Sequence, residues 1–137
     1  MQALAADLVE GEGAVSRHSG KAVLCIGNDP VCLNRRCSLL RQHGWHVISS
    51  GSGHEGLIRF GQERVDVVVL DLNSDGTESA LIAGQLNRLR PDVPVIMLVP
   101  DGNALAPGAT DLADLQVLKS QETDTLLEAL KSVRKAS

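Results

Sequence analysis

Residues 65–72, VDVVVLDL, constrain the fold more than any other stretch of the chain. The central VVVL run has no polar residue that could face water, so a strand here needs cover on both of its faces. Residues 93–99, VPVIMLV, repeat the pattern. Strands buried on both faces are typical of parallel sheets, because the helices that connect such strands lie over the two faces. We therefore expect a parallel sheet between two helical layers.

The rest of the chain alternates between short apolar runs and helical patterns, as a layered α/β fold requires. Further strands are predicted at 22–26, 45–50 and 115–119, and helices at 30–43, 54–64, 79–90 and 121–137. The apolar face of the helix at 79–90 is predicted to consist of Ile82, Leu86 and Leu89. Residues 100–114 contain two prolines and two glycines, so a helix there should be short or absent. The predicted fold is a flavodoxin-like, doubly wound, five-stranded parallel sheet with strand order 2-1-3-4-5.

Size and charge set further limits. The 137 residues, 43% of them hydrophobic, are enough for a single domain. Residues 1–20 show no sustained periodicity and are predicted to be a flexible extension, with the folded domain at 21–137. The net charge of −4 argues against direct binding of nucleic acid. Neither a membrane span nor a secretory leader is visible, so we expect no membrane association and a cytoplasmic location.

Two charged residues stand at the ends of predicted strands. Asp71 follows four apolar residues, and Lys119 ends the fifth strand. In a doubly wound sheet, ligands bind beyond the carboxyl ends of the strands. With the predicted strand order, Asp29, Asp71 and Lys119 would surround one cleft there. An ion pair between Asp71 and Lys119 that merely closes the end of the sheet would explain the same pattern, and Asp29 is expected chiefly to cap the helix that begins at Pro30.

The order and spacing of these features resemble the receiver domain of two-component response regulators, from about Lys21 to Val133. The landmarks are Gly44–Trp45 after the first helix, then SSGSGHEGL, VDVVVLDL, PVIML and VLK. The resemblance implies that Asp71 is the phosphoacceptor and that Lys119 is the partner of the phosphoryl charge. It also implies a bacterial phosphorelay protein whose partners are a histidine kinase, a phosphotransferase or an effector domain.

The sequence departs from the family pattern where magnesium would bind. Receivers normally carry an acidic pair after the first strand, and Gly27 and Asn28 stand there instead. The remaining candidate ligands are Asp71, Asn28 and Asn73, only one of which is a carboxylate. We therefore expect Mg²⁺ binding to be weak or absent, and we expect no other cofactor.

The switch positions of the family are also altered. Val99 replaces the usual Thr or Ser after the fourth strand, and Gln116 replaces the aromatic residue of the fifth strand. In place of the proline that is usual in the loop after Asp71 stands Asp75. The sequence thus predicts an atypical receiver that acts through protein contacts, is not an enzyme, and undergoes weak or no phosphorylation.

Other functions stay open at this point. A working receiver, phosphorylated on Asp71 by a histidine kinase, is the main alternative. An aspartyl-phosphate hydrolase would need a second acid two residues after Asp71, where Asn73 stands. A cofactor-binding flavodoxin-like domain would need a glycine-rich phosphate loop, which the sequence lacks. A homodimer and a separate output domain are both compatible with the sequence.

Overall fold

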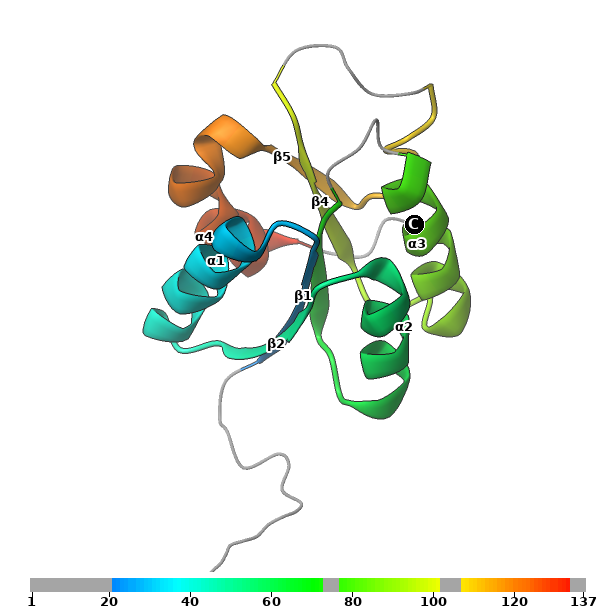
Figure 1. The fold of residues 1–137 in the computed structure, drawn as a ribbon, viewed down its shortest axis with the longest axis horizontal. Coiled ribbons are helices and arrows are strands. Elements are labelled where there is room, and N and C mark those ends of the chain that lie inside the picture. The colour runs from blue at the N-terminus through cyan, green and yellow to red at the C-terminus, as the bar shows by residue number, and fades with distance from the viewer. Residues whose placement is uncertain (1–20, 73–76, 102–106, 134–137) are drawn as a thin grey trace, which may run out of the picture.

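The computed structural model describes residues 21–72, 77–101 and 107–133. Five parallel strands form one sheet with the order β2-β1-β3-β4-β5, which confirms the predicted topology (Figure 1). The strands are β1 (Ala22–Gly27), β2 (His46–Ser50), β3 (Val67–Asp71), β4 (Val95–Val99) and β5 (Leu115–Leu118).

Helices cover both faces of this sheet. They are α1 (Pro30–Gln42), α2 (Gly53–Gln62), α3 (Thr77–Leu89) and α4 (Glu122–Ser132), with the short 3₁₀ turn η2 (Lys119–Gln121) before α4. The pair α1 and α4 lies on one face, and the pair α2 and α3 lies on the other (Figure 1). Between β4 and β5, the described residues 100–101 and 107–114 form turns and bends rather than a helix, as the glycines and prolines predict.

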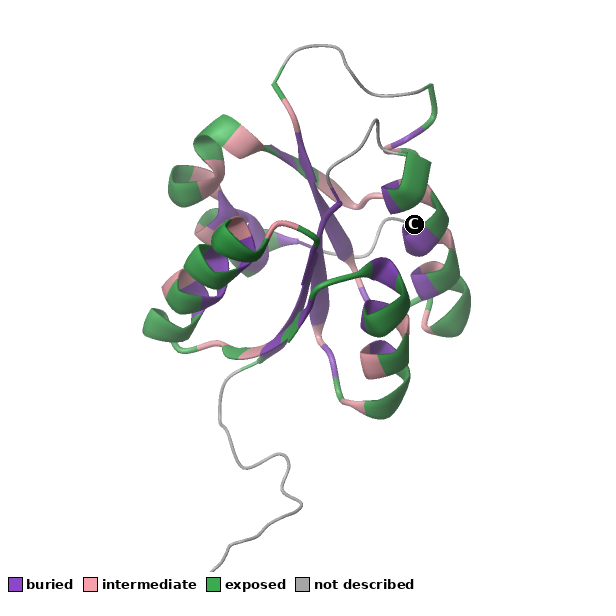
Figure 2. Ribbon diagram, viewed as in Figure 1, coloured by how far each residue is buried: buried purple, intermediate pink, exposed green. Residues whose placement is uncertain are grey.

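The core consists of two aliphatic layers separated by the sheet. One layer packs under α2 and α3 and includes Phe60, and the other packs under α1 and α4 and includes Leu126. Every residue of β1, β3 and β4 is buried, whereas the edge strands β2 and β5 are partly exposed (Figure 2). The uninterrupted apolar runs of the sequence therefore belong to central strands, as expected for a parallel sheet.

Helix α1 begins where the sequence predicts. The side chain of Asp29 accepts hydrogen bonds from the backbone N–H groups of Val31 at 3.0 Å and Cys32 at 3.2 Å, and Pro30 is the first helical residue. These bonds hold the pKa of Asp29 below its usual value, the bond from Cys32 contributing most. Asp29 is thus a helix cap, which is one of the two roles considered for it.

One expected core residue proved to be exposed. The apolar face predicted for the third helix includes Leu89, yet its side chain is 58% exposed. The next residue, Arg90, covers the core instead: its guanidinium lies 4.6 Å from the centre of the Phe60 ring and donates to the backbone oxygen of Glu63 at 3.2 Å. A long side chain with an apolar stem can cover aromatic surface while its charged end stays hydrogen-bonded.

Candidate functional site: an ion cluster at the carboxyl ends of the strands

Parallel pairing brings the predicted site residues to one edge of the sheet. Gly27 pairs in register with Asp71, so the loop after β1 lies beside the end of β3. Lys119 follows β5 directly, at the first position of η2. Its Nζ lies 2.7 Å from Oδ1 of Asp71. Asp71 and Lys119 are therefore in direct contact at this edge of the sheet, whereas Asp29, the third residue predicted around the same cleft, caps α1.

A second cation, which the sequence analysis missed, contacts the same aspartate. Arg36 of α1 donates from Nη2 to Oδ2 of Asp71 at 2.9 Å. The side chains of Arg36 and Asp71 are 1% and 4% exposed. Both carboxylate oxygens of Asp71 are thus engaged by a cation, one by Lys119 and the other by Arg36.

Arg36 also binds the first residue of α4. Its Nε donates to Oε2 of Glu122, and its Nη2 donates to Oε1 of Glu122 at 3.2 Å. One guanidinium therefore joins α1, the end of β3 and the start of α4. The fixed, fork-like geometry of guanidinium suits such simultaneous contacts with carboxylates, which a lysine could not reproduce.

The four charges of this cluster cancel one another. Arg36 and Lys119 supply two positive charges, and Asp71 and Glu122 supply two negative ones. Burial by itself would lower the pKa of Arg36, but its hydrogen bond and charge interaction with Glu122 and the charge of Asp71 raise it above the usual value. Arg36 is therefore a permanent cation inside the fold.

The guanidinium of Arg36 also borders the position where the family would carry an acidic residue. A Cβ atom added to Gly27 would lie 3.5 Å from Nη1 of Arg36 and 3.3 Å from the backbone oxygen of Asp71. Nη1 is buried and has no hydrogen-bond partner among the described residues. Gly27 has no side chain that could accept a hydrogen bond from this nitrogen. A carboxylate at the same position could supply the missing acceptor.

The other described residues predicted for the site, Asn28, Val99 and Gln116, differ in their exposure to solvent. Asn28 is exposed in the loop after β1, and Asn73 lies outside the described residues. Val99 is buried at the end of β4, and Gln116 is exposed on β5. Within the described ranges, no group of three or more His, Cys, Asp or Glu side chains could hold a metal ion.

A groove lies beside the ion cluster, between α1 and α4. Its volume is about 330 Å³. Besides the four charged residues of the cluster, its walls comprise Cys32, Arg35, Leu39 and Thr123. The cluster thus has one side from which a molecule could approach, although its two carboxylates already have partners.

The fold and this site define the class of the protein: a doubly wound, flavodoxin-like α/β domain with an aspartate and a lysine in contact at the carboxyl ends of its strands.

No family model matches the sequence. The chain is 30% identical over 115 residues to the transcriptional regulatory protein GlrR of Escherichia coli, which covers 82% of this chain and 26% of GlrR. It is 29% identical over 76 residues to the probable transcriptional regulatory protein TcrX of Mycobacterium tuberculosis, covering 56% of this chain and 32% of TcrX. The match therefore spans about a quarter to a third of these relatives.

Solved structures agree with the sequence relatives. The receiver domain protein (CheY-like) of Methanospirillum hungatei has a TM-score of 0.73 at 22% identity, over 82% of this chain and 92% of that one. The response regulator TrrA of Thermotoga maritima has a TM-score of 0.72 at 25% identity, over 81% and 96%. The chain belongs to the response-regulator receiver domains of two-component signalling.

Over residues 21–72, 77–101 and 107–133, none of the helices has the length and apolar character needed to cross a bilayer.

Proposed function

We propose that this receiver domain works as a protein-interaction module in phosphorelay signalling and that Mg²⁺-dependent phosphorylation of Asp71 is weak or absent. The observation that carries the proposal is the pairing of Asp71 with two cations, Lys119 at 2.7 Å and Arg36 at 2.9 Å. The altered positions Gly27, Asn28 and Val99 point the same way.

The charges disfavour a magnesium ion. Mg²⁺ requires near-octahedral oxygen ligands, usually including one or two carboxylates that are free to bind it. Here it would have to displace Arg36 or Lys119 from Asp71, and the displaced cation would stay close to it. Asn28 offers only a neutral carbonyl oxygen. The residues present therefore do not fit a magnesium site.

The same contacts disfavour a phosphoryl transfer. A carboxylate oxygen of Asp71 would have to attack the phosphorus atom of a donor, so that an oxygen–phosphorus bond forms and the donor departs. Each oxygen of Asp71 is held by a cation, which lowers its tendency to attack. Val99 supplies no hydroxyl that could bond a phosphoryl oxygen.

Protein partners follow from the family. TrrA, one of the similar structures, is known in complex with the histidine kinase ThkA. For this chain we propose a histidine kinase, a phosphotransferase or an effector domain as the partner, bound through surface contacts rather than through a covalent phosphoryl group. We expect no catalytic turnover from the domain itself.

Acetyl phosphate tests the proposal. The chain is incubated with acetyl phosphate and Mg²⁺, and its intact mass is measured, with Asp71→Asn as the control. We expect no phosphoryl adduct beyond that of the control. A stoichiometric adduct that disappears in Asp71→Asn would contradict the proposal and establish the alternative, a working phosphoacceptor.

A gain-of-function variant identifies the cause. Gly27→Asp and Asn28→Asp restore the acidic pair, and Arg36→Ala removes the competing cation. We expect the adduct to appear only when the three changes are combined, because the carboxylates alone would pair with Arg36. Circular dichroism of each variant verifies that it is folded.

A further inference from the structure

A second pocket lies at the opposite end of the sheet, where the strands begin. Its volume is about 330 Å³. Three segments form its walls: the residue before β1, the turn between α1 and β2, and the end of α4. The lining residues are Lys21, His43, Gly44, Trp45, Leu130 and Lys131. Gly44 has a φ of 91°, a conformation that glycine adopts without strain and that turns the chain from α1 into β2.

The pocket is basic. Three of its lining residues are Lys21, His43 and Lys131, and no acidic residue lines it among those described. Lys131 forms an ion pair with Glu128, whose Oε2 lies 3.8 Å from Nζ, and both side chains are more than 70% exposed. An ion pair so exposed is weak and can yield to another anion.

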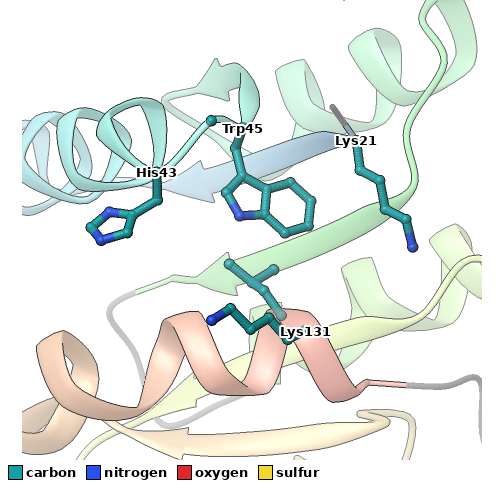
Figure 3. Close-up of a pocket in the computed structure, with 6 residues that line it drawn as sticks. Lys21, His43, Trp45 and Lys131 are labelled. Carbon is teal, nitrogen blue, oxygen red and sulfur yellow. The ribbon is translucent and has the colours of Figure 1, made fainter. Parts of the chain in front are cut away.

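The aromatic wall of the pocket is held in place. The backbone N–H of Trp45 donates to Leu40 at 3.1 Å, and the half-buried indole packs against the core layer under α1 and α4. The ring of His43 is fixed by a hydrogen bond from Nδ1 to the backbone oxygen of Leu39 at 3.0 Å. Figure 3 shows Trp45 between His43 and Lys21, with Lys131 facing it from α4. A fixed ring is thus flanked by cations on flexible stems.

We propose that this pocket binds an anion of the mononucleotide class, with its planar base against Trp45 and its phosphate between Lys21 and Lys131. Bases of any identity can stack on an accessible face of an aromatic side chain, and ammonium groups bind phosphate as point charges. The volume lies at the lower end of the range of about 300–1,000 Å³ that is typical of ligand pockets. Leu130, which also lines the pocket, supplies an apolar contact.

Titration of the full chain with AMP tests this proposal. Trp45 is the sole tryptophan, so its fluorescence reports directly on the pocket. We expect saturable quenching by AMP, and affinities at least about five-fold lower for adenosine and for inorganic phosphate, because each lacks one half of the interaction.

Substitutions test the contributions of the Trp45 ring and of the lysine charges one at a time, with AMP binding measured by calorimetry. Trp45→Leu should weaken AMP binding by about five-fold or more, while Trp45→Phe should retain most of it. Lys21→Gln and Lys131→Gln should each weaken binding by about two- to five-fold. Arg88→Gln, which removes an exposed cation on α3, is the matched control and should leave binding unchanged.

Three results would overturn the proposal. The first is the absence of saturable binding at millimolar AMP. The second is equal affinity for AMP and inorganic phosphate together with no effect of Trp45→Leu, which would mean that charge alone attracts anions. The third is a loss in Arg88→Gln as large as that in Lys131→Gln, which would mean that the attraction is not specific to the pocket.

Discussion

The two ends of the sheet differ in how their charged side chains are compensated. At the carboxyl ends of the strands, Arg36 and Lys119 are paired with Asp71 and Glu122, and Arg36 and Asp71 are buried. At the amino ends, Lys21 and Lys131 stand around Trp45 with no acidic lining residue among those described. Buried charges must be compensated within the protein, whereas exposed charges are compensated by water. Removal of one partner from the first set would leave a buried charge without compensation, whereas the second set is available to a ligand.

Packing also differs between the buried and the exposed side of helix α2. Near the carboxyl end of β1, helix α2 approaches so closely that a Cβ on Gly56 would lie 2.5 Å from Cδ1 of Ile26. Near the end of α2, a Cβ on Gly61 would meet nothing within 4 Å. Gly56 therefore lies in close contact with β1, whereas Gly61 faces open space.

The largest expected effect is at Arg36. Arg36→Met leaves Asp71 and Glu122 without their shared cation, so we expect the free energy of unfolding to fall by about 3–5 kcal/mol in urea denaturation. Arg35→Met, which removes the exposed neighbour on α1, is the matched control and should change stability by less than about 0.5 kcal/mol. Equal effects of the two substitutions would show that the buried cluster does not stabilise the fold.

The packing difference is tested on a single helix. Gly56→Ala places a methyl group against the fully buried Ile26, and we expect a loss of about 1–3 kcal/mol. Gly61→Ala adds the same methyl group in open space and should be neutral or stabilise by up to about 1 kcal/mol, because alanine favours a helix over glycine. Thermal unfolding of both variants measures the difference, and a neutral Gly56→Ala would contradict the close approach.

A smaller, pH-dependent effect is expected at Asp29, the cap at the start of α1. The pKa of Asp29 is lowered in the folded state. Its contribution to the stability of the fold is therefore present above the unfolded pKa of about 3.9 and is lost as the pH falls through the folded pKa. Asp29→Ala should lower the Tm at pH 7, and the gap to the wild type should close in acid. A gap that persists unchanged at pH 2 would mean that the cap does not act through its charge.

The smallest effect on stability is expected at the amino end. Lys131→Gln removes a cation whose only described ion pair, with Glu128, is exposed, so the free energy of unfolding should change by less than about 0.5 kcal/mol. Chemical denaturation measures it. A loss comparable to that of Arg36→Met would remove the distinction between the two ends.

The sequence predicted part of the carboxyl-end site and missed the rest for a clear reason. Asp71 and Lys119 follow apolar strands directly, so the parallel topology alone brings them to one edge. Arg36 had a local signal, since it shares the helical face of Leu33, Cys37 and Leu40, all buried. A basic residue on an apolar face suggests a buried partner, but nothing near Arg36 in the sequence identifies Asp71 or Glu122.

The sequence by itself determined the alternation of strands and helices, the central position of the two longest apolar runs, and the cap at Asp29. These features depend on hydrophobic periodicity and on contacts between residues close in the chain. Only the tertiary structure decided that Arg36 contacts Glu122, 86 residues later, and that Trp45 meets Lys21 and Lys131 at one pocket. Such contacts depend on how helices lie across the sheet, which residue patterns along the chain do not specify.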